Sequence, residues 1–62
     1  MKGFIKITTT NNQITYINVN HIIKFSRETA DECRIYLRDK TLIQTHSTLE
    51  EIEKLIDNAL SS

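Results

Sequence analysis

One cysteine and two histidines are the side chains whose types could support nucleophilic or metal chemistry: Cys33, His21 and His46. A nucleophilic site needs a serine or cysteine beside a base and an orienting acid. Cys33 falls at an inward-facing position of a strand pattern, where cysteine packs as a small apolar residue. The histidines are 25 residues apart, and neither has a second ligand at the spacing typical of zinc sites. We therefore expect no catalytic residue, no metal and no cofactor.

Four acidic side chains lie close together near the C-terminal end: Glu50, Glu51, Glu53 and Asp57. They resemble a paired-carboxylate cluster, but a helix explains their positions, because its first turn favours negative charge. Gly3 is the single glycine, so the chain has no glycine-rich loop that could cradle phosphates. The sequence thus predicts a protein that is not an enzyme.

Basic and aromatic residues alternate along one predicted strand and offer an alternative function. Arg34, Tyr36 and Arg38 share one face of this strand, and Lys24 of a neighbouring strand lies beside them. Such a face can hold phosphates and stack a base. The formal net charge is zero, which is a weak electrostatic footprint for nucleic acid. A regulatory accessory that binds nucleic acid is therefore the alternative hypothesis, and we do not expect nucleic acid as the main partner.

The elements that must position these residues are mostly strands. Ten isoleucines and eight threonines favour strands, because β-branched side chains are stiff at χ1. Apolar and polar residues alternate in five short segments, separated by turns at Asn11–Gln13 and Asp39–Lys40 and by a polar loop over 28–32. The predicted strands cover about 3–10, 14–19, 22–27, 33–38 and 41–46. We expect a single domain over 1–62 that is built on an antiparallel β-meander, either open or closed into a half-barrel.

The C-terminal segment changes period and is predicted as a helix over about 49–60. From Leu49 onward, apolar residues recur at spacings of three and four, which makes one apolar stripe. Thr48 followed by Glu51 is a capping box, and it places the start of the helix at Leu49. A helix with one stripe packs on one face of the sheet, so the fold class is α+β.

Because one helix packs on one sheet face only, apolar residues on the other face must be buried in another way, by closure of the sheet or by a partner. The surplus apolar residues on the uncovered face are Phe4, Ile14, Tyr16, Ile22 and Tyr36. Together they exceed what a monomer of this size exposes. A domain this small is marginally stable unless a disulfide, a metal or oligomerisation supports it, and one cysteine cannot form an internal disulfide. We expect a homo-oligomer, with another protein as the second possible partner.

The stretch "NVNHIIKF" over 18–25 is predicted to connect two strands. Asn18 and Asn20 suit a bend, because their side chains can hydrogen-bond nearby backbone. Val19 and Ile23 are expected to anchor the flanking strands in the core, and His21 is expected to be a solvated corner residue. The octet thus marks the fold and not an active site.

Compartment and membrane association follow from composition. A chain with a single cysteine suits a reducing cytoplasm. The first twelve residues contain no apolar run long enough for a signal peptide, and no segment could span a membrane. We expect a cytoplasmic protein without membrane insertion.

Two family resemblances rest on quoted stretches of the sequence. "IKITTTNN", "INVNHIIKF", "CRIYLRDKT" and "STLEEIEKLI" resemble the short bacterial flagellar proteins of the FlbD/SwrD type, nearly end to end. That resemblance implies a role in flagellar motility and no catalysis. "VNHIIKF", "IYLRDKT" and "STLEEIEKL" are also similar to the N-terminal part of LytTR-type DNA-binding domains, which implies a shared topology. Those domains make much of their DNA contact after the corresponding helix.

Overall fold

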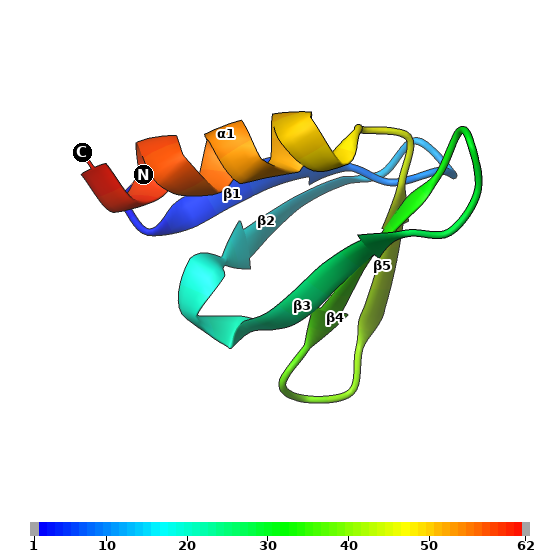
Figure 1. Cartoon of the computed structure of the whole chain (residues 1–62). Helices are drawn as coiled ribbons and strands as arrows, with labels where there is room; N and C mark the ends of the chain where they lie inside the picture. The colour runs from blue at the N-terminus through cyan, green and yellow to red at the C-terminus, as the bar shows by residue number, and fades with distance from the viewer. Residues whose placement is uncertain (1, 62) are drawn as a thin grey trace.

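The computed structural model describes residues 2–61, so the two ends of the predicted domain, residues 1 and 62, lie outside the described part. Five strands precede one C-terminal helix (Figure 1). The elements are β1 (Phe4–Thr8), β2 (Ile14–Asn18), β3 (Ile22–Arg27), β4 (Cys33–Leu37), β5 (Leu42–Thr45) and α1 (Leu49–Ser61). The predicted α+β class, with antiparallel strands and a C-terminal helix, is confirmed.

The strands form two sheets, not one continuous meander. β1 pairs with β2, and β3, β4 and β5 pair in that order. The sheets meet where Thr9 forms a bridge with Thr45 and the Thr10 N–H donates to the Gln44 carbonyl at 3.0 Å. Within residues 2–61, β2 and β3 do not pair. A 3-10 turn, η1 (Val19–His21), redirects the chain between them, so the meander is broken at this step.

The sequence explains this break locally. Asn18 caps η1, because its side-chain oxygen accepts the Asn20 N–H at 2.9 Å. An Asn side chain that bonds the backbone two residues on competes with strand pairing. The predicted corner at 18–21 is therefore confirmed.

Both predicted tight turns place one residue in the left-handed region. Asn12 has φ 67° in the β1–β2 turn, and Lys40 has φ 72° in the β4–β5 turn. Asn tolerates this conformation better than most residues, which fits the predicted turn at Asn11–Gln13. The Asp39 carboxylate accepts the Thr41 N–H at 3.0 Å and so closes the second turn.

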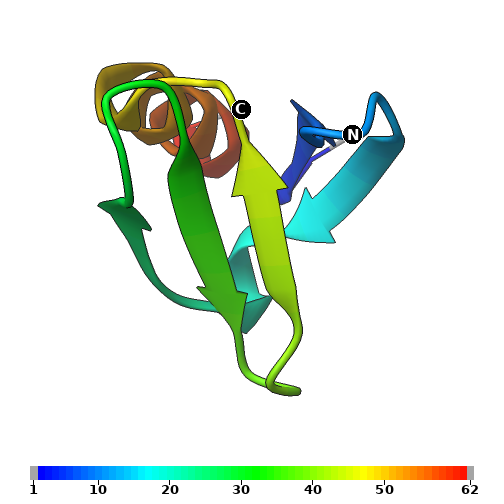
Figure 2. The same cartoon turned by 90° about the vertical axis from the view of Figure 1, so that its right-hand side faces the viewer.

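The core lies between the two sheets and α1, which packs on β1 and β3. In Figure 2, β3, β4 and β5 stand side by side, the β1–β2 hairpin lies to their right, and α1 closes one end. Among the described residues the buried apolar side chains are Ile5, Ile7, Ile17, Cys33, Ile35, Ile52 and Ala59. Because this core is small, apolar side chains that remain on the surface are candidates for contact with a partner.

The start of α1 confirms the predicted capping box. The Thr48 N–H donates to Glu51 Oε1 at 2.8 Å, and the Glu51 N–H donates to Thr48 Oγ1 at 3.1 Å. These two bonds satisfy backbone donors that the first turn of a helix leaves unpaired. No helix within residues 2–61 is long and apolar enough to cross a membrane.

A bulge in β3 overturns one expectation about the core. Ile22 pairs with Leu37 and Lys24 pairs with Tyr36, which leaves Ile23 as an extra residue between them. Because an extra residue shifts the alternation of faces, Ile22 packs against the core and Ile23 is 64% exposed. The prediction that Ile23 anchors the strand was wrong, whereas Val19 does pack against the core.

Candidate protein-interaction site

The face of the β1–β2 sheet that points away from the core carries three exposed apolar side chains. Phe4 pairs with Asn18, Tyr16 with Lys6, and Ile14 with Thr8, so these residues share one face. Phe4 is 36% exposed, Tyr16 55% and Ile14 61%. We call Phe4, Ile14 and Tyr16 the outer face. It gathers three of the five residues predicted to form an interface.

The other two predicted interface residues lie elsewhere. Ile22 packs against the core, because the bulge in β3 turns it inward. Tyr36 belongs to the three-stranded sheet, and its ring lies 4.7 Å from the ammonium of Lys24. Neither is part of the outer face, because the predicted single sheet is divided into two.

β2 is an edge strand whose free side can be identified from its hydrogen bonds. The Thr9 N–H donates to the Gln13 carbonyl at 2.8 Å, and the Val19 N–H donates to the Gly3 carbonyl at 2.9 Å. Bonding alternates along an antiparallel ladder, so the odd-numbered residues of β2 bond to β1. The backbone groups of Ile14, Tyr16 and Asn18 therefore point to the free edge, where no strand of residues 2–61 pairs with them.

An open groove runs beside this free edge. A hollow of about 390 Å³ is lined by Phe4 and Thr15–Asn18 of the β1–β2 hairpin and by Leu37, Thr41 and Ile43 of the β4–β5 hairpin. His21 and Asp39 also line it. A second hollow of about 290 Å³ shares Thr15 and Ile43 with the first and reaches the β1–β2 turn. We call these two adjacent hollows together the β2 groove.

The electrostatics of the β2 groove are set by Asp39. The Thr41 hydroxyl and then the Thr41 N–H donate hydrogen bonds to its carboxylate and lower its pKa below the ordinary 3.8, with a small further effect of nearby His21. The carboxylate is therefore ionised at neutral pH. Among the described residues, no lysine or arginine lines either hollow.

Alternating polarity could not reveal this groove from the sequence. It exists because β2 and β3 diverge after η1 (Figure 1), and that divergence depends on contacts between distant segments. His21 is exposed as predicted. Its carbonyl accepts the Arg38 N–H at 2.8 Å, which ties η1 to the β4–β5 turn. The only local feature of the sequence that indicates the divergence of β2 and β3 is the Asn-rich corner at the end of β2.

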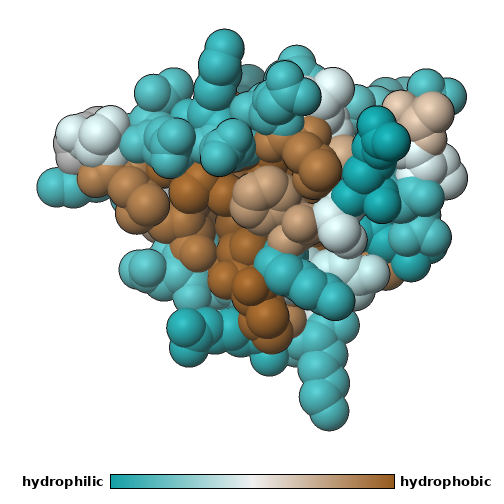
Figure 3. All heavy atoms as spheres, in the orientation of Figure 1, coloured by the Kyte–Doolittle hydropathy of each residue, from teal (hydrophilic) through white to brown (hydrophobic). Residues whose placement is uncertain are grey.

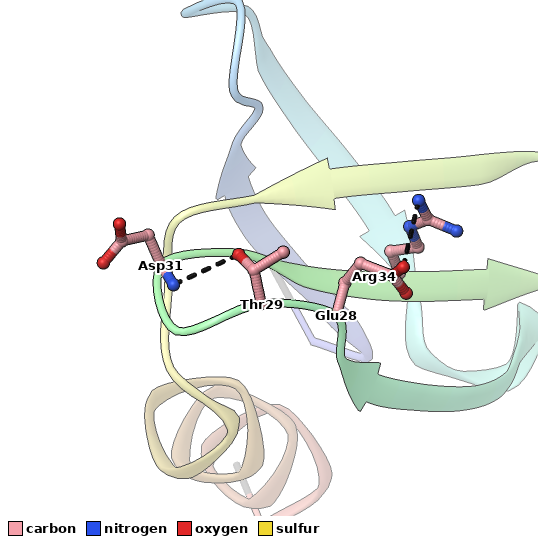
Figure 4. A network of polar contacts seen from close by, with 4 residues as sticks. All are labelled: Glu28, Thr29, Asp31 and Arg34. Atoms are coloured by element: carbon pink, nitrogen blue, oxygen red, sulfur yellow. Dashed lines mark hydrogen bonds and ion pairs between the residues drawn. The ribbon is translucent and has the colours of Figure 1, made fainter.

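The basic face of the three-stranded sheet is partly assembled as predicted. Lys24 pairs with Tyr36 and Arg34 with Ser26, so Lys24, Arg34 and Tyr36 share one face, whereas Arg38 lies beyond the end of β4. The Arg34 guanidinium lies 3.5 Å from the Glu28 carboxylate (Figure 4). Lys24 and Arg34 thus already have partners within the chain.

The loop that supplies Glu28 is held by local bonds. The Asp31 N–H donates to the Thr29 hydroxyl at 3.3 Å (Figure 4), and His46 Nδ1 lies 3.0 Å from the Asp31 carbonyl. Cys33, next to this loop, is a free and buried thiol. Within residues 2–61, no group of three His, Cys, Asp or Glu side chains could hold a metal ion.

A second apolar area lies on the side of the molecule drawn in Figure 3. There, apolar side chains gather in a band between α1 and β3. Ile23 and Leu60 are 64% and 61% exposed, and Phe25, Leu55 and Ile56 are partly buried against the core. Ile23 of β3 provides a comparison for the outer face, because it is as exposed as Ile14.

Comparison with known proteins yields no relative. No protein-family model matches the chain, and neither a curated protein nor a solved structure matches it. The resemblances to short flagellar proteins and to LytTR-type domains therefore stay predictions.

Proposed function

We propose that this protein is a small non-enzymatic interaction module that self-associates through the outer face. The observation that supports this most is the grouping of Phe4, Ile14 and Tyr16, all exposed, on one face of a two-stranded sheet. Apolar groups that lie together on a surface mark association sites more often than scattered ones do. A second copy is the simplest partner, because a two-fold interface uses the same patch twice.

Sedimentation equilibrium over the micromolar range tests the proposal. We expect an average mass above the 7.2 kDa of one chain that decreases on dilution. A cooperatively folded protein with the mass of one chain at every concentration would refute self-association.

The flagellar role implied by the FlbD/SwrD-type resemblance would place this module in a motility assembly. Such a role agrees with a protein that works by contact and not by catalysis. Nucleic-acid binding remains the alternative, supported by the shared face of Lys24, Tyr36 and Arg34. It is less well supported than self-association, because Glu28 already neutralises Arg34.

A further inference from the structure

We propose that the β2 groove binds a single extended segment of a partner protein, which adds as an antiparallel strand to β2 and places a lysine or arginine next to Asp39. This binding goes beyond self-association, because its hydrogen bonds are made by the backbone edge of β2 and its side-chain contacts by the β4–β5 hairpin, although Phe4 and Tyr16 of the outer face also border the groove.

The first support is the contrast between two edge strands, β3 and β2. β3 has a bulge and carries Lys24 and Arg27, features that discourage pairing with another strand. β2 has the sequence ITYIN, which contains no charge, no proline and no bulge. The backbone groups of Ile14, Tyr16 and Asn18 are thus left unprotected at this edge.

The second support is the space beside that edge. The two hollows that form the groove run along β2 from Asn18 to Gln13. β2 has five residues, and at about 3.3 Å per residue an added strand of the same length spans about 17 Å. Its inward side chains would contact Leu37 and Ile43, which are only partly buried. We therefore expect apolar side chains at alternate positions of the bound segment, where they would pack on Leu37 and Ile43.

The third support concerns which occupant fits. On its core side, β2 is covered by its own domain, where Ile17 is 3% exposed. If the β2 strands of two copies paired symmetrically, the core of the second copy would lie on the same side of the joined sheet as the core of the first. It would then stand directly beside the β2 edge of the first copy. The β4–β5 hairpin already occupies that place with Leu37, Thr41 and Ile43. A single extended segment, with nothing packed on its inward side, avoids this collision.

Charge complementarity defines one end of the segment. Asp39 is the carboxylate in the groove lining, and the described lining contains no lysine or arginine to neutralise it. Asp39 lies at the Asn18 end of β2, because the N–H of its neighbour Arg38 donates to the His21 carbonyl of η1, which directly follows Asn18. In an antiparallel addition, the N-terminal residue of the segment reaches this end. A basic residue is therefore expected at the start of the bound segment.

Amide NMR titration with short capped peptides tests the proposal. The probe is the peptide Lys-Thr-Val-Thr-Val, whose Lys and Val side chains share one face of a strand, and the comparison peptides are its N-methylated form and a form with Glu in place of Lys. We expect shifts confined to β2, Leu37 and the β4–β5 turn, with affinity at least about tenfold lower for the N-methylated peptide, which cannot form the ladder bonds. The Glu peptide should bind about threefold to tenfold more weakly.

A charge reversal in the protein completes the design. Asp39→Lys should reverse the preference between the Lys and Glu peptides, and Lys24→Glu on the bulged β3 edge is the matched control that should leave it unchanged. The proposal is overturned if millimolar peptide moves no resonance of the groove, or if N-methylation leaves affinity unchanged. It is also overturned if the resonances of Leu37, Thr41 and Ile43, which line the groove but are not part of the outer face, move on dilution of the protein alone, because a second copy would then be the occupant.

Discussion

Replacing Ile14 with lysine should weaken self-association by about two orders of magnitude. Complete burial of an isoleucine side chain is worth about 2.5 kcal/mol. Ile14 is 61% exposed, so covering the exposed part is worth about 1.5 kcal/mol. A two-fold interface contains this residue twice, which gives about 3 kcal/mol and about a 100-fold higher Kd. A lysine on an edge strand also discourages pairing without disturbing the buried face.

Ile23→Lys is the matched control for this experiment. Ile23 is an isoleucine of the edge strand β3 and is 64% exposed, so the two substitutions change composition and exposed area almost equally. Sedimentation velocity over a concentration series should show a weakened dimer for Ile14→Lys and an unchanged one for Ile23→Lys, while urea unfolding checks that both variants fold. Equal association of Ile14→Lys and wild type, or an equal loss for Ile23→Lys, would refute the outer face as the interface.

Three further predictions concern the cap, the turn and the basic face. Thr48→Ala should lower the free energy of unfolding by about 1 kcal/mol in urea, because the Glu51 N–H loses its acceptor; an unchanged midpoint would contradict the cap. Hydrogen bonds from Thr41 lower the pKa of Asp39, so its contribution to stability is present above the unfolded pKa near 3.8 and is lost as pH falls through the lower folded value. Asp39→Asn should therefore flatten the decline in stability between about pH 5 and about pH 2, and an identical pH profile would oppose this. Labelled single-stranded DNA in low salt should show little anisotropy change, and tight binding that falls with salt and on Arg34→Ala would instead favour the alternative function.

Local patterns in the sequence were enough to predict the helix and the strands. The Thr48–Glu51 cap and the apolar stripe predict α1 to within a residue, because both depend on neighbours within one helical turn. Alternation likewise predicts β3 over 22–27 as observed, and the other strands are shorter at their ends. At those ends the backbone enters turns, as at Asn18, whose side chain starts η1.

Pairing between strands was harder to predict, because it depends on residues far apart in the chain. The bulge between Ile22 and Lys24 exchanges the expected roles of Ile22 and Ile23, and alternation alone cannot show an extra residue. Phe4, Ile14 and Tyr16 do share an exposed face, because they belong to one hairpin. Their role as an interface stays a prediction. The β2 groove was not predicted, because it forms where the two sheets diverge and local alternation does not show that divergence.

An NMR dilution series tests the central claim most directly, namely that the outer face is a self-association surface. Spectra recorded from millimolar to low micromolar protein should show concentration-dependent shifts at Phe4, Ile14 and Tyr16. Ile23 of β3 and Leu60 of α1, which are 64% and 61% exposed, should not shift. Shifts confined to Ile23 and Leu60, or spectra that do not change with concentration, would contradict the claim.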